Sequence, residues 1–267
     1  MCNTSELAAS QLRDYDARTP GMLFTDPIPL SEEQAYAVQS EVCRLREQRG
    51  ETMVGYKVGC TSPVVQRQLG IDHRVFGRLF DSECWPSGKK LPSAQFSGLA
   101  IEGELAVRLA RDLPDFELSE GELTAAIESV FAVIELHNFI FRRSDPSAAE
   151  LIANNAIHAG FIYATNHSSR LNLAPATLCI EIDEVEVATV SGVELTHTIS
   201  DSLHWLSDEL GRRGHILRAG QTILCGSVAD LIPAPQGCHI AVTTDRFGLA
   251  ECTIDDHQQR RPQENYH

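Results

Sequence analysis

One stretch decides the fold: Leu99-Ala100-Ile101-Glu102-Gly103-Glu104-Leu105-Ala106-Val107. On a β-strand, residues two apart point to the same face, so Glu102 and Glu104 would project side by side from an otherwise apolar strand. On a helix they would not face each other. Two carboxylates held together away from water repel, and each raises the pKa of the other. A cation that prefers oxygen ligands removes that cost, so the stretch predicts a metal-binding strand. The alternative is an edge strand with two solvated glutamates.

The composition indicates a globular protein that avoids anionic partners. The chain has 267 residues, 43% of them hydrophobic, which suffices for one large domain or for a small lobe and a large domain. Its net charge of -15 argues against nucleic acid and against anionic membranes. We find no signal peptide and no apolar run of about 18 residues, so the cytoplasm is the expected location. The eight cysteines form no Cys-x-x-Cys pair, which argues against a zinc knuckle.

The pattern along the chain predicts a small helical lobe followed by a larger strand-rich domain. Residues 1–52 contain a capping box at Ser31 and an apolar stripe at helical spacing. Residues 53–256 alternate short strand patterns with helices, which we expect to begin near Ser119 and Thr198 and to end near Ser129 and Arg213. Residues 257–267 form a polar tail. The fold class is therefore expected to be α+β.

Two charged residues lie in unusual surroundings. Glu135 is the only charge between Val130 and Leu136, and a buried carboxylate is expensive unless it is paired or protonated. The alternatives for it are an edge position or a salt bridge to an arginine such as Arg142. Lys57 lies in a glycine-flanked strand, where a ligand can approach closely. Near a metal it would bind a carboxylate or stabilise developing negative charge, and otherwise it would be a surface lysine.

The histidines give a weaker signal than these charged residues. No two of them have the spacing of a zinc site. His137 follows Glu135 by two residues and could share its face, and His158 lies near the start of an expected strand. A structural or exposed position is the alternative for each.

Several short motifs occur in an order typical of one enzyme family. The main motifs are Gly55-Tyr56-Lys57-Val58-Gly59-Cys60-Thr61-Ser62, Ile101-Glu102-Gly103-Glu104-Leu105, the strand ending at Glu135, and Leu224-Cys225-Gly226-Ser227. Across residues 32–254 these motifs resemble the 2-keto-4-pentenoate hydratase and 4-oxalocrotonate decarboxylase branch of the fumarylacetoacetate hydrolase superfamily.

The resemblance implies a mixed β-roll, a 2-keto acid substrate, a homo-oligomer and a role in the catabolism of aromatic compounds. It implies Mg²⁺ or Mn²⁺ bound by Glu102, Glu104 and Glu135. Three carboxylates leave octahedral positions open for a chelating 2-keto acid, and the metal would stabilise an enolate as a Lewis acid. Catalytic roles are predicted for Lys57 and His158. Substrate contacts are predicted for Gly59, Thr61, Ser62, Asn155 and Ser227.

The sequence departs from relatives at three places around the expected site. Val75 stands where relatives often carry an aspartate before Phe-Gly. His137-Asn138 replaces an Asp-Ser-Arg pattern, and Asn154 to His158 replaces an Asp-Asn followed by serines. The acid and base groups around the metal are therefore altered, and His137 or His158 could take a new role.

The leading hypothesis is a metal-dependent lyase that hydrates or decarboxylates an unsaturated 2-keto acid. One alternative is a C–C bond hydrolase of an acylpyruvate, in which His137 or His158 would activate water. Another is a non-catalytic subunit of a hydratase–decarboxylase assembly. The retained glutamates argue against that last alternative, whereas the lost aspartate at Val75 argues for it.

Overall fold

The Glu102 stretch forms β5 (Leu99–Leu109), a central strand of the larger sheet. It pairs antiparallel with β6 (Ile127–Asn138), and the register places Glu102 directly opposite Glu135. Its other edge is shared by β10 (Thr222–Leu224) and β11 (Ile232–Pro233). Glu102 and Glu104 are only 4% and 1% exposed, which excludes a solvated edge strand.

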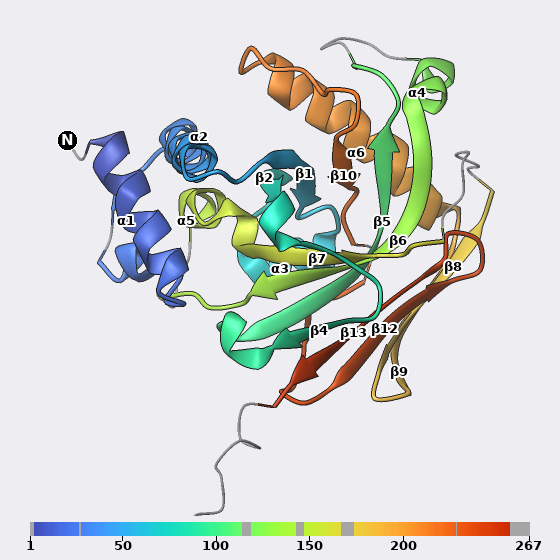
Figure 1. Ribbon diagram of the computed structural model, residues 1–267. Helices are drawn as coiled ribbons and strands as arrows, with labels where there is room; N and C mark the ends of the chain where they lie inside the picture. Colours follow the sequence, from blue (N-terminus) through green and yellow to red (C-terminus); the bar gives the residue numbers. More distant parts are fainter. Residues whose placement is uncertain are drawn as a thin grey trace, which may run out of the picture.

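Two sheets of mixed strand direction form the body of the molecule (Figure 1). The computed structural model describes residues 3–26, 28–113, 119–142, 147–166, 174–227 and 229–256, so the predicted tail lies outside the described residues. The larger sheet has the order β2 (Val75–Phe80), β1 (Met53–Gly59), β10, β5, β6, β7 (His158–Tyr163) and β3 (Cys84–Pro86). The smaller has the order β4 (Lys89–Pro92), β13 (Leu249–Asp255), β12 (His239–Thr244), β8 (Ala176–Ile182) and β9 (Val185–Gly192).

Gly103 allows the two sheets to approach each other at β5. It lies between the two glutamates and points to the opposite face, toward β8. A Cβ atom at this position would lie 2.9 Å from both Cδ1 and Cγ1 of Ile180 and 3.1 Å from Cδ2 of Leu178. Strand β5 therefore presents carboxylates on one face and bare backbone to the second sheet on the other.

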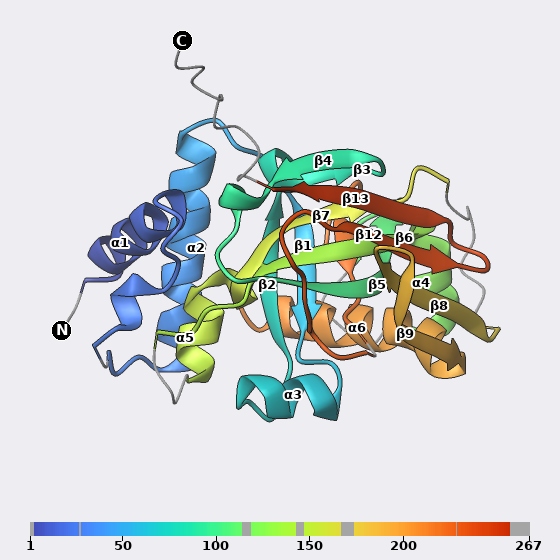
Figure 2. The same ribbon diagram turned by 90° about the horizontal axis from the view of Figure 1, so that it is seen from below.

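The helices lie around the sheets in separate groups. Helices α1 (Thr4–Asp16), α2 (Glu32–Gln48) and α5 (Ala148–Ala153) gather on one flank, and α6 (Val193–Gly211) lies away from them (Figures 1 and 2). The remaining helical elements are α3 (Pro63–Leu69), α4 (Glu120–Ala126), and the short 3-10 turns η1 (Met22–Phe24), η2 (Asp81–Glu83), η3 (Ser93–Gln95) and η4 (Asn155–Ile157). The architecture is thus α+β, a mixed β-roll with a small N-terminal helical portion.

Helix α2 is fixed to the body by aromatic stacking and buried hydrogen bonds. The Tyr36 ring stacks on Phe76 of β2 with centroids 4.4 Å apart. Gln39 Nε2 donates to the backbone oxygens of Phe76 and Ile152, each at 2.9 Å. Helix α5, from the later chain, also packs against α2, and the division of the chain after residue 52 remains a prediction.

Two element boundaries differ from those expected. The helix expected to reach Ser129 ends at Ala126, because Ile127 is already extended and begins β6. Helix α6 begins at Val193, five residues before Thr198, because the apolar stripe extends back to the buried Leu195. Both errors occur where helix and strand are joined without a polar linker.

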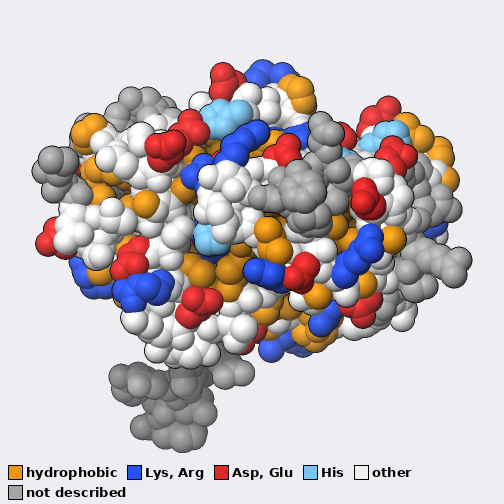
Figure 3. Space-filling view, turned by 90° about the horizontal axis from the view of Figure 1, so that it is seen from above, with side chains coloured by type: hydrophobic (Ala, Val, Ile, Leu, Met, Phe, Trp, Pro, Cys, Tyr) orange, Lys and Arg blue, Asp and Glu red, His pale blue; other side chains and the backbone are white. Residues whose placement is uncertain are grey.

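The surface carries both signs of charge. On the face shown in Figure 3, acidic and basic side chains are interspersed with hydrophobic ones. No helix among the described residues is long and apolar enough to cross a membrane.

The close packing at Gly103 predicts that adding a side chain at this position destabilises the fold. Gly103→Ala should lower the free energy of unfolding by about 1–3 kcal/mol, because the added methyl group overpacks the contact with Ile180. Gly121→Ala in α4 is the matched control, since its Cβ meets nothing closer than 4.0 Å and alanine favours a helix. Urea denaturation measures both, and equal stabilities for the two variants would contradict this account of Gly103.

Candidate active site

Two strands bring three potential metal-binding side chains together. Glu102 of β5 lies opposite Glu135 of β6, and His137 follows Glu135 by two residues on the same face. One ligand atom from each of the three lies within 4.8 Å of the others, and all three side chains are buried. The β5–β6 ladder therefore builds the centre of the site.

Glu104 lies beside this group on the same strand face, although it is outside the close set of ligand atoms found among the described residues. Its Oε2 accepts a 2.8 Å hydrogen bond from the backbone N–H of Gly226. Burial, followed by the charges of Glu135 and Glu102, raises the pKa of Glu104 well above its usual value. Its role as a third ligand remains a prediction.

Lys57 of β1 supplies a buried positive charge. Its Nζ lies 3.2 Å from Glu135 Oε1. The absence of a side chain at Gly59 leaves room for it, since a Cβ there would lie 3.2 Å from Nζ. Burial lowers the pKa of Lys57, but the charges of Glu135, Glu102 and Glu104 outweigh burial and raise it, so the amine is protonated at neutral pH.

The partner of Glu135 is therefore lysine and not the arginine considered from the sequence. The Arg142 Nε donates instead to the backbone oxygen of Pro20 at 3.0 Å. The buried Lys57 is therefore not the surface lysine that the sequence left as an alternative.

A β-bulge places His158 in the site. The β6–β7 register shifts after Leu136, so that His158 replaces Ala159 opposite His137. Its Nδ1 lies 2.7 Å from Glu135 Oε1. Burial lowers the pKa of His158 even though the Glu135 charge opposes this, so the imidazole is neutral at pH 7.

The protonation of Glu135 decides the tautomer of His158. Burial raises the pKa of Glu135, but the charges of Lys57 and His137 and the bond with His158 hold it well below its usual range. Glu135 is thus ionised and accepts a hydrogen bond from Nδ1–H, which leaves the lone pair of His158 on Nε2.

Two carboxyl oxygens without partners indicate whether the site can hold a metal ion. Glu135 Oε2 and Glu104 Oε1 are buried and have no hydrogen-bond partner within the part of the chain that the structure describes. Such atoms are costly unless a ligand binds them. Three buried carboxyl groups also face one ammonium group, and oxygen donors are those that hard divalent cations prefer. The site therefore fits a divalent cation.

A narrow cavity lies beside this cluster. Its polar side contains Lys57, Glu102 and His137. The rest of its wall is formed mainly by apolar side chains from separate elements: Val65, Leu69, Val75, Leu151, Ala156, Ile157 and Leu231. The cavity thus has one charged end and an apolar body.

The segment before His158 adopts a rare backbone conformation. Asn155, Ala156 and Ile157 have φ values of 55°, 50° and 56°, and such values are strained for a β-branched residue like Ile157. The Asn155 side chain holds the segment by accepting from the backbone N–H of Arg78 at 2.7 Å and donating to its oxygen at 2.9 Å. The Asn155 amide is therefore occupied by β2.

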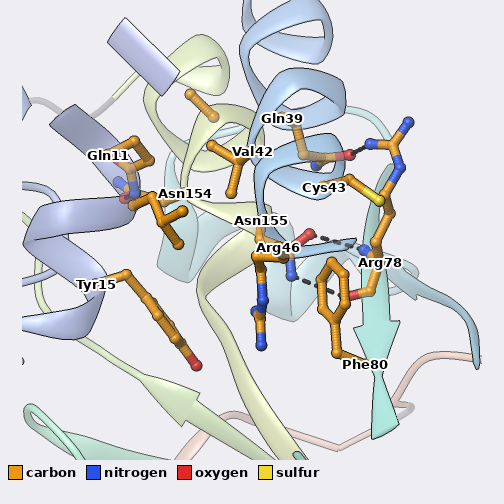
Figure 4. A pocket seen from close by; sticks show the side chains of 12 residues that line it. Gln11, Tyr15, Gln39, Val42, Cys43, Arg46, Arg78, Phe80, Asn154 and Asn155 are labelled. Atoms are coloured by element: carbon orange, nitrogen blue, oxygen red, sulfur yellow. Dashed lines mark hydrogen bonds between the residues drawn. The ribbon is translucent and has the colours of Figure 1, made fainter. Parts of the chain in front are cut away.

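Figure 4 shows these Asn155 bonds at the edge of a second cavity, between α1, α2 and β2. Among the residues that line it are Gln11, Tyr15, Arg46 and Arg78. The clustered glutamates do not line it, so this cavity is separate from the candidate metal centre.

The other predicted substrate-binding residues have different positions. Gly59 lines the cavity at the cluster. Thr61 Oγ1 donates to the backbone oxygen of Ser227 at 2.9 Å, and Ser62 Oγ caps α3 by accepting from Val65 N–H at 3.2 Å. The Ser227 hydroxyl accepts from Ala229 N–H at 3.1 Å. Substrate contacts for these residues remain predictions.

Sequence reasoning understated two features of the site. A structural or exposed position is the sequence-based alternative for His137, yet this side chain is buried among the carboxylates. Its position two residues after Glu135 was the available signal. The apolar wall was missed, because Leu69, Leu151 and Leu231 come from distant segments and carry no local motif.

The chain is similar to curated hydratases over most of its length. It is 30% identical over 224 residues to the 2-keto-4-pentenoate hydratase of Burkholderia vietnamiensis, which covers 83% of this chain and 86% of that protein. It is 29% identical over 243 residues to the 2-hydroxyhexa-2,4-dienoate hydratase of Comamonas testosteroni, covering 89% and 91%. No protein-family model matches the chain.

Solved structures agree with the sequence relatives. The 4-oxalocrotonate decarboxylase of Pseudomonas putida G7, complexed with magnesium and adipate, superposes with a TM-score of 0.85 at 25% identity, covering 94% of this chain and 97% of that one. Fold and relatives together define a lyase of the hydratase and decarboxylase type. The chain belongs to the 2-keto-4-pentenoate hydratase family, within the fumarylacetoacetate hydrolase superfamily.

The buried ion pair predicts a strong effect of removing its cation. Lys57→Met, measured by urea denaturation with a chelator present, should lower the free energy of unfolding by about 3–5 kcal/mol, because Glu135 loses its main counter-charge. Arg108→Gln is the control, since Arg108 and Glu128 form an exposed pair whose loss should cost at most about 1 kcal/mol. Equal losses in the two variants would show that Lys57 does not neutralise the cluster.

Proposed function

We propose that the chain is a divalent-metal-dependent hydratase of an unsaturated 2-keto acid that has an apolar tail. The observation that carries this proposal is the cavity with Lys57, Glu102 and His137 at one side and an apolar wall elsewhere. A 2-keto acid has the same division, with two adjacent oxygen-bearing groups at one end and a hydrocarbon chain at the other.

Glu102, Glu104 and Glu135 would hold Mg²⁺ or Mn²⁺. The unpartnered Glu135 Oε2 and Glu104 Oε1 support this assignment, and solved relatives were complexed with magnesium or calcium. When bound, the cation would polarise the keto group as a Lewis acid and stabilise negative charge there. The proposal also includes a homo-oligomeric assembly in the cytoplasm.

Lys57 and His158 would supply the other two catalytic groups. The Lys57 ammonium supplies positive charge for the substrate carboxylate or for the enolate that develops beside it. It is protonated, so it cannot serve as the base. His158 contacts Glu135 behind the residues that line the cavity, and its neutral Nε2 would accept the proton that water releases as the water oxygen adds to the double bond. The carbon beside the keto group receives a proton to complete the addition.

The apolar wall selects the substrate tail. Lys57 is the only lysine or arginine among the described residues that line the cavity, and it belongs to the cluster end. A second carboxylate on the tail would be buried against side chains such as Leu69, Val75 and Leu231 without a counter-charge, which is costly. A monocarboxylate therefore fits better than a dicarboxylate such as 4-oxalocrotonate.

Decarboxylation is the second candidate, and the high structural similarity to a decarboxylase favours it. The two reactions share the binding of a 2-keto acid and the stabilisation of an enolate. They differ in the product, because hydration gives a 4-hydroxy-2-keto acid and decarboxylation releases CO₂.

The metal site predicts stabilisation by divalent ions. Mg²⁺ or Mn²⁺ at a hundred times its dissociation constant should stabilise the fold by about 2.7 kcal/mol, visible as a rise in Tm. Glu102→Gln should lose this rise, whereas Glu128→Gln, an exposed residue outside the site, should keep it. An unchanged Tm in the wild type together with no binding in calorimetry would contradict the metal site.

The cavity wall predicts substrate preference. With Mg²⁺ present, kcat/KM for 2-hydroxypenta-2,4-dienoate should exceed that for 4-oxalocrotonate by at least about 100-fold, because the second carboxylate is buried unpaired. Mass spectrometry should find a 4-hydroxy-2-keto acid as the product. CO₂ release would instead identify a decarboxylase, and two fragments that include a carboxylic acid would identify a C–C bond hydrolase.

A paired substitution controls the substrate experiment. Leu69→Arg should reduce the preference for the monocarboxylate by placing a cation in the wall, whereas Leu69→Met keeps the wall apolar and should leave the ratio unchanged. Equal ratios in both variants would mean that the tail does not lie against Leu69.

A further inference from the structure

We propose that His137 is a fourth protein ligand of the metal, through its Nε2 atom, and that this nitrogen gives the site a preference for Mn²⁺, Co²⁺ or Fe²⁺ over Mg²⁺. This inference rests on the metal site of the proposed function. It concerns a donor that the carboxylate triad does not include.

The contacts of His137 with Glu102 and Glu135 are short enough for all three side chains to bind one ion. Its Nε2 lies 3.1 Å from Glu102 Oε2 and 3.7 Å from Glu135 Oε2. Adjacent donors on an octahedral ion with bonds of about 2.1 Å are roughly 3 Å apart. His137 is therefore placed where a ligand of the ion shared by these two glutamates would lie.

The sheet explains why the imidazole reaches this position. Its ladder partner on β5 is Ala100, whose methyl group fills little of the face, and Glu102 is two residues further along the same face. The His137 ring is 1% exposed and also lines the cavity, so it is buried at the point where the carboxylates meet the substrate space.

The unpartnered Glu135 Oε2 is the second observation that points to a ligand. It is fully buried, has no hydrogen-bond partner among the described residues, and lies on the His137 side of the carboxylate. The other oxygen of Glu135 is already engaged by Lys57 and His158. Glu135 thus has one oxygen for its protein partners and one for an ion beside His137.

His158 does not compete for this role. Its Nδ1 is directed at Glu135 Oε1 at 2.7 Å, and it is outside the close group formed by Glu102, Glu135 and His137. The site would therefore have a single nitrogen donor.

A nitrogen donor alters which ions bind well. Imidazole suits transition metals, whereas Mg²⁺ is bound almost entirely by oxygen. Three carboxylates and one imidazole would leave two of six positions, which equals the number of oxygens that a chelating 2-keto acid provides.

Pulsed electron paramagnetic resonance of the Mn²⁺-loaded full chain tests the inference without measuring activity. The wild type should show a ¹⁴N coupling to Mn²⁺, and the coupling should change to that of ¹⁵N when the protein is made with ¹⁵N-histidine. His158→Gln should retain the coupling and His137→Gln should lose it. The wild-type labelling needs no variant, so the test survives a folding failure of His137→Gln.

Competition between ions gives a second measurement. The ratio of Mn²⁺ to Mg²⁺ affinity, from calorimetry, should fall at least about tenfold in His137→Gln and little in His158→Gln. Mn²⁺ binding without any histidine coupling would overturn the role of His137 while leaving the metal site intact. No Mn²⁺ binding at all would overturn the metal site, and this inference with it.

Discussion

The structure depends on holding carboxylates opposite each other across two buried strands. Glu102 and Glu135 are ladder partners in the middle of the larger sheet, with Glu104 beside them. Without a positive charge nearby, these carboxylates would repel one another. Lys57 supplies that charge from β1, on the far side of β10, and the histidines of β6 and β7 complete the enclosure. The strand order thus determines where the charged side chains meet as well as how the hydrophobic core packs.

One ion pair assigns different states to chemically similar groups. Lys57 stabilises Glu135 as a carboxylate, whereas Glu104 has its pKa raised by burial and by the charged Glu135. His158 remains neutral because burial outweighs its charged neighbour. The cluster therefore combines a carboxylate, a carboxyl group with a raised pKa, a neutral imidazole and unpartnered carboxyl oxygens. Such prior arrangement reduces the reorganisation that a reaction would require.

Much of the fold and the centre of the site could be predicted from residue patterns. The two-residue spacing of Glu102 and Glu104 indicates a shared strand face, and the lone charge of Glu135 indicates an unusual environment, both of which are local signals. The Lys57–Glu135 pair, the bulge that turns His158 inward and the role of Asn155 on β2 were not predictable in this way. They depend on strand order and register, which are set by contacts between distant segments.

The bare backbone at Gly103 has a consequence for how this protein can change over time. Ile180 touches the link between two acidic residues of the site, so the spacing of those residues is tied to the size of a side chain in a different sheet. A larger side chain at position 180 of β8 would crowd that link. New substrates are therefore more accessible through changes in the apolar wall, whose residues lie outside the β5–β6 ladder.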